Sequence, residues 1–284
     1  MDQIVVLKDG RKLGYAQYGD PKGKPLFFFH GWPTCRLHAK YLEKIAKELK
    51  IRIISPDRPG IGLSDYQKNR TLLDYPNDIV ELADILNIKK FATLGISGGG
   101  PYAAVCAFKI PSRLTKSGIV VGLAPTYLPG LLDNMQGINK FGWSNYGRIP
   151  ILRAIVSLIQ YSLAYLSPGF GLYRFIYSSK SDRKMHSDPG MRKTSKQNSK
   201  EAFRQGYKGA EQDLKIYTTN WGFNLKDIKT KVYLWYGEED KNVSLSMGRY
   251  YAKQIPNSKL TIYPNEGHLC QMTHAEEIMR TLIS

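Results

Sequence analysis

Short apolar runs alternate along the chain with longer segments in which apolar residues recur at helical spacing. The short runs predict strands over residues 4–7, 12–18, 25–29, 52–55, 91–94, 116–121, 232–236 and 260–263. The longer segments predict helices over residues 38–49, 77–86, 101–109, 244–254 and 274–282. Because strands and helices alternate, we expect an α/β fold with a mostly parallel sheet. The turn dipeptide Asp9-Gly10 separates the first two strands, so the sheet should begin with an antiparallel pair.

The alternation of strands and helices stops near residue 123 and resumes near residue 223. The region between shows no clear strand pattern, several helix-like apolar stretches and a polar basic segment over residues 178–200. We interpret this region as a helical insertion. We therefore predict a core domain formed by residues 1–122 and 223–284, with a helical cap over residues 123–222.

One apolar run in the predicted cap, over residues 151–166, is nearly long enough for a membrane span. Arg153 and Gln160 interrupt it, and Pro168-Gly169 breaks it soon after its end. These residues count against a span. We expect instead an amphipathic helix that is buried over the core.

The composition fits one globular domain with an insertion, since the chain has 284 residues of which 42% are hydrophobic. The amino terminus begins with Asp2 and a short strand instead of a secretory hydrophobic region, so we expect a cytoplasmic protein. Three cysteines without C-x-x-C spacing argue against a disulfide framework and against a zinc site. We accordingly expect free thiols, no metal and no cofactor.

The formal net charge of +17 would attract nucleic acid or an acidic membrane surface. Residues 180–208 hold nine Lys or Arg against three Asp or Glu, and the remaining excess is spread thinly along the chain. No recognised nucleic-acid-binding module accompanies this charge. It therefore predicts a solvated basic surface and no nucleic-acid partner.

The motif Gly95-Ile96-Ser97-Gly98-Gly99 follows one predicted strand and precedes a predicted helix. A serine on such a sharp turn adopts strained backbone angles and needs glycine neighbours, and its hydroxyl projects toward a substrate. In a chain with 26 glycines the pattern alone could also be a tight turn. Its position between a strand and a helix favours a nucleophile at Ser97.

A serine hydroxyl becomes a good nucleophile only when a base takes its proton and a third group orients that base. Asp240 and His268 each follow a predicted strand. Carboxyl ends of parallel strands share one edge of the sheet, where Ser97 also lies. The order Ser97, Asp240, His268 is the one expected for a triad on this topology. Two glutamates directly before Asp240 are competitors, but the spacing favours the aspartate.

Attack on a carbonyl group creates an oxyanion, which N–H donors already in place must stabilise. The turn His30-Gly31-Trp32-Pro33 directly follows the predicted strand over residues 25–29. We expect the N–H groups of Trp32 and of Gly98, the residue after the serine, to converge on one oxygen position. His30 is then a structural residue of the turn and not a second base.

With these motifs the chain resembles the α/β-hydrolase superfamily over nearly its whole length. The resemblance rests on the H-G-x-P turn at residues 30–33, the segment Asp57-Arg58-Pro59-Gly60-Ile61-Gly62-Leu63-Ser64, the serine elbow, the G-x-x-D loop that ends at Asp240 and the Gly267-His268 pair. It implies an eight-stranded, mostly parallel sheet flanked by helices, with a helical cap inserted after the sixth strand. It also implies a Ser97, Asp240 and His268 triad with oxyanion donors at Trp32 and Gly98.

The H-G-x-P turn is similar to that of epoxide hydrolases and haloalkane dehalogenases, which use an aspartate nucleophile. A serine at position 97 favours acyl transfer to water instead. We therefore expect a serine hydrolase, most simply a carboxylesterase for small to medium acyl or aryl esters. The apolar pocket would be lined by cap aromatics that could equally be packing residues, namely Trp143, Tyr146, Phe170, Tyr173 and Phe175.

Three other interpretations stay open. An aminopeptidase of the proline iminopeptidase type would need cap carboxylates to hold the substrate ammonium group, but Glu201, Glu211 and Asp213 fit a helix surface better. A ligand receptor could keep the fold without catalysis, although the complete triad argues against it. A peripheral membrane protein would combine the apolar run over residues 151–166 with the basic segment after Ser178.

Overall fold

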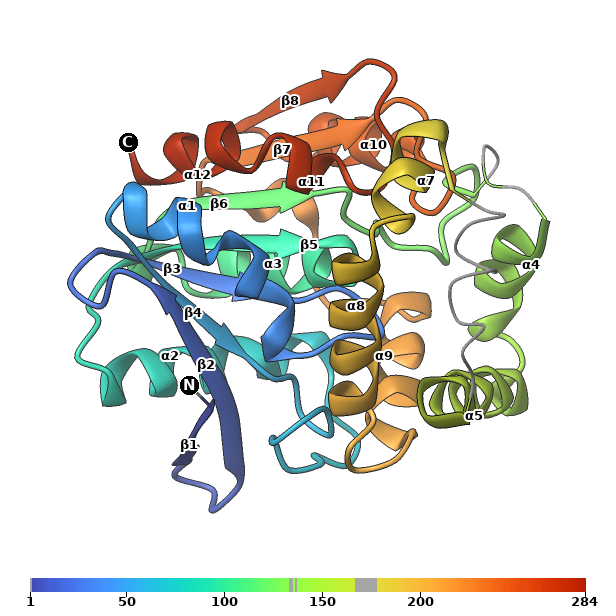
Figure 1. The fold of residues 1–284 in the computed structure, drawn as a ribbon, viewed down its shortest axis with the longest axis horizontal. Coiled ribbons are helices and arrows are strands. Elements are labelled where there is room, and N and C mark those ends of the chain that lie inside the picture. The colour runs from blue at the N-terminus through green and yellow to red at the C-terminus, as the bar shows by residue number, and fades with distance from the viewer. Residues whose placement is uncertain (1, 133–134, 136, 167–177) are drawn as a thin grey trace.

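The computed structural model describes residues 2–132, 135, 137–166 and 178–284. Its centre is an eight-stranded sheet with the strand order β1-β2-β4-β3-β5-β6-β7-β8 (Figure 1). The strands are β1 (Asp2–Val6), β2 (Lys12–Gly19), β3 (Lys24–Phe29), β4 (Ile51–Pro56), β5 (Phe91–Ile96), β6 (Leu114–Val120), β7 (Val232–Gly237) and β8 (Ser258–Tyr263). Strand β2 runs antiparallel to β1 and β4, and every pair from β4 to β8 is parallel. The predicted mostly parallel sheet with an antiparallel start is therefore confirmed.

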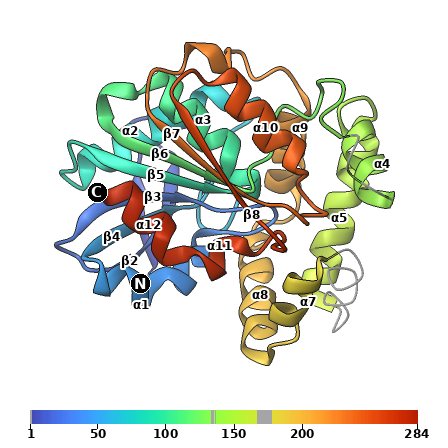
Figure 2. The ribbon, with the colours of Figure 1, turned by 90° about the horizontal axis from the view of Figure 1, so that it is seen from above.

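Helices cover both faces of the sheet (Figure 2). One face carries α1 (Glu43–Glu48), α11 (Cys270–Thr273) and α12 (Ala275–Ile283), and the other carries α2 (Tyr75–Ile85), α3 (Gly100–Lys109) and α10 (Leu245–Gln254). Four of the five predicted core helices match α2, α3, α10 and α12 apart from their ends. The helix expected over residues 38–49 begins instead as a 3₁₀ helix (Arg36–Leu42) before α1. This first part buries the Arg36 guanidinium, which pairs with Asp57 at 2.9 Å.

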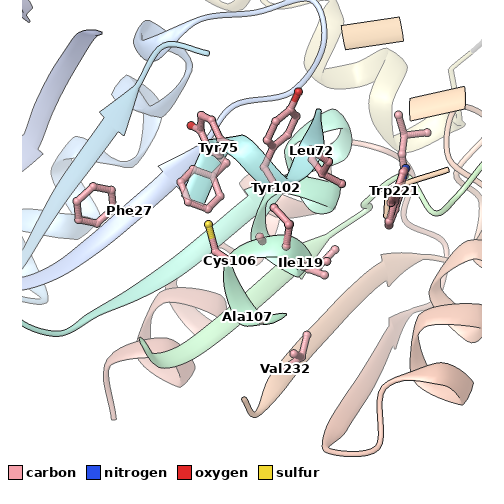
Figure 3. Close-up of a cluster of buried hydrophobic side chains, with 14 of the residues drawn as sticks. Phe27, Leu72, Tyr75, Tyr102, Cys106, Ala107, Ile119, Trp221 and Val232 are labelled. Carbon is pink, nitrogen blue, oxygen red and sulfur yellow. The ribbon is translucent and has the colours of Figure 1, made fainter. Parts of the chain in front are cut away.

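Strand β3 shows how the sheet is buried on both sides. Its side chains alternate between the two faces because a strand has a period of two residues. Phe27 and Phe29 join the core cluster shared with α2 and α3, whereas Leu26 and Phe28 join the cluster shared with α1 and α12. The ring centroids of Phe27 and Phe91 lie 4.4 Å apart within the first cluster. Figure 3 shows part of this cluster, including Phe27, Tyr75 and Tyr102. Burial on both faces holds the carboxyl ends of the strands in place.

The helical insertion lies between β6 and β7. Its described helices are α4 (Gly137–Tyr146), α5 (Pro150–Leu166), α7 (Lys180–His186), α8 (Pro189–Ala202) and α9 (Lys208–Thr218). They lie beyond the carboxyl ends of the strands (Figure 1), and the described part of the insertion contains no strand. The basic segment after Ser178 forms α7 and α8. Asp188 is the N-cap of α8, because its carboxylate accepts a hydrogen bond from the Met191 N–H at 2.7 Å.

Helix α5 differs from the prediction. The amphipathic helix forms, but its fully buried residues are Arg153, Ser157 and Ala164, and six of its large apolar side chains are exposed. The expected burial over the core is therefore only partial: Val156 and Tyr161 pack against core clusters, whereas most of the large apolar side chains of the helix lie at the surface. The buried side includes the polar residue Arg153, which donates a hydrogen bond to Glu211 of α9 at 3.0 Å. None of the described helices is both long and apolar enough to cross a membrane.

Candidate active site

Ser97 stands on a strained turn between β5 and α3. Its φ angle is 54°, in the left-handed region that side chains other than glycine rarely adopt. The turn needs its glycines because the backbone is crowded there. A Cβ atom on Gly95 would collide with the Gly99 carbonyl, and one on Gly99 would collide with the Phe29 carbonyl of β3. The strand-to-helix turn expected from the motif is thus present, and it lifts the serine hydroxyl above the edge of the sheet.

Ser97, His268 and Asp240 form one line of hydrogen bonds. The Ser97 hydroxyl lies 3.1 Å from Nε2 of His268, and Nδ1 of His268 lies 2.7 Å from Oδ2 of Asp240. The Asp240 side chain is fully buried, whereas 18% of the His268 side chain is exposed. If Nδ1 donates its proton to the carboxylate, Nε2 is left as the acceptor that faces the serine. The arrangement is thus that of a nucleophile, a base and a carboxylate that orients the base.

The backbone of the loop after β7 fixes the Asp240 carboxylate. The second oxygen of Asp240, Oδ1, accepts hydrogen bonds from the N–H groups of Asn242 at 2.7 Å and Val243 at 3.0 Å. Glu238 and Glu239, the competing carboxylates, are exposed. Of these three acidic residues, Asp240 is the one that the structure brings to His268.

The turn after β3 lies against the residue that follows the serine. A Cβ atom placed on Gly98 would lie 2.9 Å from Cβ of Trp32 and 3.1 Å from its backbone nitrogen. The same point lies 2.7 Å from the Tyr217 hydroxyl of α9. Only a glycine leaves this space open. Trp32 and Gly98, whose backbone N–H groups are the expected oxyanion donors, thus lie against each other.

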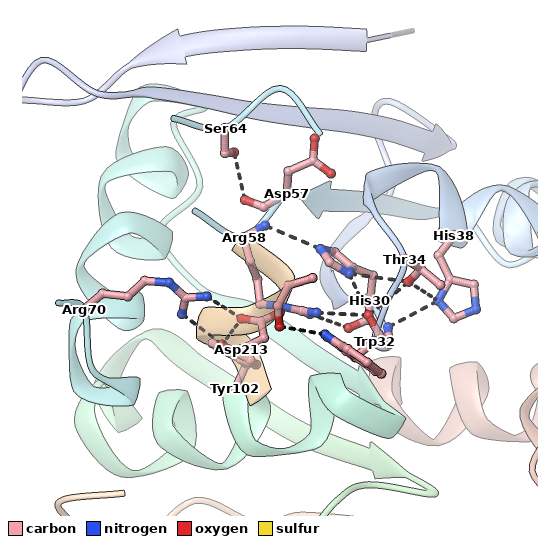
Figure 4. A network of polar contacts seen from close by, with 12 residues as sticks. His30, Trp32, Thr34, His38, Asp57, Arg58, Ser64, Arg70, Tyr102 and Asp213 are labelled. Carbon is pink, nitrogen blue, oxygen red and sulfur yellow. Dashed lines mark hydrogen bonds and ion pairs between the residues drawn. The ribbon is translucent and has the colours of Figure 1, made fainter. Parts of the chain in front are cut away.

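Arg58 holds the turn after β3 from its buried side (Figure 4). Its guanidinium donates to the carbonyl oxygens of His30 at 2.5 Å and Gly31 at 3.0 Å. Because the trans peptide group is planar, fixing the Gly31 carbonyl also fixes the opposite direction of the Trp32 N–H. His30 is fully buried, and burial, followed by the charge of Arg58, lowers its pKa well below the usual value. It therefore stays a neutral structural residue.

Asp213 of α9 joins this core network to the cap. It accepts hydrogen bonds from Nε of Arg58 at 2.7 Å, from the Tyr102 hydroxyl at 2.8 Å and from Arg70 (Figure 4). Burial alone would raise the pKa of Asp213, but the charges of Arg58 and Arg70 hold it below its usual value. The expectation that Asp213 lies on a helix surface is wrong, since the residue is fully buried. The two buried arginines explain why a carboxylate is needed there.

A second cap carboxylate, Asp182 of α7, holds the loop that carries His268. Its carboxylate accepts hydrogen bonds from the backbone N–H groups of His268 at 2.9 Å and Leu269 at 2.8 Å, and the residue is almost fully buried. The helix approaches so closely that a Cβ on Gly267 would collide with Ser179 and Asp182. Ser179 and Asp182 form a helix-start pattern in the sequence, but that pattern gives no hint of the distant partner loop.

The cap aromatics are described only in part. The ring centroids of Trp143 and Tyr146 lie 5.6 Å apart, and Trp143 lies 6.1 Å from the ring of Tyr217. Trp143 is thus connected through Tyr217 to the space beside Gly98. The other three residues expected to line a substrate pocket lie outside the described residues, namely Phe170, Tyr173 and Phe175. Among the side chains that the structure describes, no group of three or more His, Cys, Asp or Glu could hold a metal ion.

Residues 24–275 match the family model of the alpha/beta hydrolase fold, so the chain belongs to this family. An uncharacterized hydrolase of Saccharomyces cerevisiae is 26% identical over 283 residues, which cover 99% of this chain and 95% of that protein. A bifunctional esterase/perhydrolase of Acinetobacter calcoaceticus is 24% identical over 99% of this chain and 98% of its own length. The solved structure of a thermophilic esterase from Thermogutta terrifontis superposes with a TM-score of 0.72 at 20% identity and full coverage of both chains.

Asp182 provides a prediction about the histidine loop. Replacing it with alanine should lower the kcat of hydrolysis about 10²-fold with little change in KM, because the substrate still binds but the imidazole is misplaced. Asp182→Asn should lie between wild type and alanine, since one amide oxygen still accepts one of the two N–H groups. Steady-state kinetics on a short-chain ester measures both parameters.

The matched control is Asp188→Ala, which removes an exposed capping carboxylate from the neighbouring helix. It should leave kcat near that of wild type. Equal kcat values for Asp182→Ala and Asp188→Ala would show that the carboxylate does not position the histidine.

Proposed function

We propose that the protein is a serine hydrolase that cleaves carboxylic esters of small to medium hydrophobic acyl or aryl substrates. The observation that carries the proposal is the continuous line of hydrogen bonds from Ser97 through His268 to Asp240. The neighbouring N–H groups of Trp32 and Gly98 supply what acyl transfer needs besides a nucleophile and a base. The proposed reaction uses no group beyond these side chains, two backbone amides, the ester and water.

In the proposed mechanism Ser97 attacks the ester carbonyl while Nε2 of His268 takes the hydroxyl proton. Asp240 keeps Nδ1–H oriented and stabilises the imidazolium that forms. The carbonyl oxygen gains the negative charge and receives hydrogen bonds from Trp32 and Gly98. His268 then returns its proton to the departing alcohol, which leaves an acyl group on Ser97. A water molecule, activated by the same imidazole, releases the acid and restores the serine.

The family relationship supports a hydrolase that acts on small molecules, and the serine at the elbow directs the proposal toward acyl transfer. The relative from Acinetobacter calcoaceticus is named an esterase and perhydrolase, and the Thermogutta terrifontis protein is an esterase. For the acyl pocket we propose the cap aromatics around Trp143 and Tyr146. Phe170, Tyr173 and Phe175 complete that proposal from the sequence alone.

An aminopeptidase is disfavoured by what the cap carboxylates contact. Glu201 pairs with Arg36 at 2.8 Å, and Glu211 pairs with Arg153 at 3.0 Å. Asp213 is enclosed by two arginines and Tyr102. Each of these carboxylates already neutralises an arginine, so none is available to hold the ammonium group of a peptide substrate.

Tyr217 supplies a test of the oxyanion geometry. Its buried hydroxyl has no hydrogen-bond partner among the described residues, and burial raises its pKa well above the usual value, so it keeps its proton. We propose that this hydroxyl donates to the same oxygen as Trp32 and Gly98. Tyr217→Phe should then lower kcat by about 10²-fold at nearly constant KM, as expected for the loss of one donor to the oxyanion.

Stability should change little in Tyr217→Phe because the hydroxyl has no partner to lose. Thermal unfolding of both proteins provides that control. A kcat equal to that of wild type would show that Tyr217 only packs against Trp143 and Tyr102.

The substrate class is tested with p-nitrophenyl esters from acetate to palmitate, alongside proline p-nitroanilide. The proposal predicts turnover of the esters, with an optimum at short to medium chain length, and negligible turnover of the anilide. Faster cleavage of the anilide would favour the aminopeptidase. Tight ligand binding without turnover of any substrate would favour a receptor.

A further inference from the structure

Helix α5 presents most of its large apolar side chains to the outside of the cap. Its exposed side holds large apolar side chains, each between 42% and 82% exposed, namely Ile151, Ile155, Leu158, Ile159, Tyr165 and Leu166. These positions recur at helical spacing and form one stripe along the helix. The residues on the opposite, buried side are Arg153, Ser157 and Ala164. Such a stripe on the surface of a cap indicates that something apolar covers it in use.

The surroundings of this stripe carry positive charge. Residues 137–166 include the exposed Lys140 and Arg148 but neither an Asp nor a Glu, and their third cation, Arg153, is buried and paired with Glu211. Residues 180–202, which form α7 and α8 and the turn between them, hold seven further Lys or Arg, all of them exposed, against three acidic residues. Of these acidic residues, Asp182 is buried against the histidine loop and Asp188 caps α8.

The apolar stripe and the basic helices are in contact. The Tyr165 hydroxyl at the end of α5 donates to the Lys200 carbonyl of α8 at 3.0 Å. The Lys200 ammonium lies 5.8 Å from the centre of the Tyr165 ring. Figure 1 shows α5, α7 and α8 on the side of the molecule beyond the carboxyl ends of the strands, with α8 between the other two helices. Apolar area and positive charge therefore belong to one part of the surface.

We propose that the α5 stripe, together with α7 and α8, is a docking surface for an anionic lipid bilayer. Apolar side chains enter the boundary between head groups and acyl chains, while lysines and arginines around them attract acidic head groups. A second copy of this chain fits the surface less well, because each copy carries a net charge of +17 and paired caps would bring basic helices together. A membrane supplies both the apolar cover and the opposite charge.

The test is flotation of the full chain with vesicles. Vesicles of phosphatidylcholine mixed with phosphatidylglycerol are compared with vesicles of phosphatidylcholine alone, at low and at high salt. The protein carries Ser97→Ala, so that hydrolysis of lipid cannot influence the result. We expect flotation with the mixed vesicles at low salt, a marked loss at high salt and little flotation with phosphatidylcholine alone.

Variants assign the binding to this surface. Ile155→Glu with Leu158→Glu should weaken partitioning at least about 10-fold, because two exposed apolar residues that enter the interface are replaced by charged ones. The matched control is Ile4→Glu with Val6→Glu, which changes exposed apolar residues of β1 and should float like the parent protein. Lys193→Glu with Lys196→Glu should reduce flotation and its dependence on salt. All three pairs lie at exposed positions, and circular dichroism checks their folding.

Three results would overturn the proposal. The parent protein could stay in solution with the mixed vesicles, or the α5 variant could float like its control. Light scattering could show a dimer that the α5 substitutions dissociate, which would make a second copy the occupant. None of these results depends on whether the protein hydrolyses esters.

Discussion

Ser97→Ala is expected to lower kcat of ester hydrolysis by at least ~10³-fold while the fold is retained. The hydroxyl is the proposed nucleophile, and it acts as a unit with His268 and Asp240, so removing it forfeits most of their combined effect. The residual rate comes from the N–H donors and from substrate binding. Initial rates on p-nitrophenyl acetate or butyrate measure the loss. Circular dichroism and thermal unfolding establish that the variant is folded.

The matched control for this substitution is Ser144→Ala, because Ser144 is an exposed serine of α4. It should hydrolyse esters at the wild-type rate. Normal hydrolysis by Ser97→Ala would contradict the proposed mechanism and would indicate that another residue attacks the substrate.

Asp213→Ala should produce the largest loss of stability. The free energy of unfolding is expected to fall by about 3–5 kcal/mol, because Arg58 and Arg70 would remain buried without a counter-charge. The loss should extend to catalysis, since Arg58 holds the carbonyls of the turn that presents Trp32. Urea denaturation measures the stability, and ester kinetics on the folded variant measures the second effect.

Asp213→Asn separates charge from hydrogen bonding. It keeps one acceptor oxygen for the network but removes the negative charge, so its stability should fall between those of wild type and Asp213→Ala. Glu211→Ala is the comparison on the same helix and should cost less, because the half-buried Glu211 pairs with one arginine, Arg153, whereas Asp213 pairs with two. A loss of under about 1 kcal/mol for Asp213→Ala would show that the buried arginines do not depend on this carboxylate.

The fold could be predicted from the sequence because its signals are local. Each strand of the sheet is a compact apolar run such as residues 25–29, and its helices repeat apolar positions at helical spacing. The dipeptide Asp9-Gly10 was enough to predict the antiparallel start. The 3₁₀ helix over Arg36–Leu42 was missed because the ion pair of Arg36 with Asp57, a partner far along the chain, accompanies it.

The proximity of Ser97, Asp240 and His268 could be predicted from the sequence because of the sheet topology. Parallel strands bring their carboxyl ends to one edge, so residues after β5, β7 and β8 must lie near one another. The structure brings Ser97, Asp240 and His268 within hydrogen-bonding distance. Their roles, and those of Trp32 and Gly98, stay predictions until activity is measured.

The contribution of the cap could not be predicted from sequence patterns. Asp182 and Asp213 are ordinary acidic residues of polar helices, and only the packed structure shows that they contact the histidine loop and Arg58. Which side of α5 faces the core could not be predicted either, because an apolar stripe gives the same sequence pattern whether it faces the core or the outside. Tertiary packing decides both, and it is set by residues far apart in the chain.

The most direct test of the proposed serine hydrolase is the site of reaction with a fluorophosphonate probe. The protein and its Ser97→Ala variant are incubated with the probe and digested, and mass spectrometry locates the adduct. The proposal predicts an adduct on Ser97 in wild type and none in the variant, since the reaction requires a serine activated by its base. Absence of labelling at Ser97, or labelling at another residue, would contradict it.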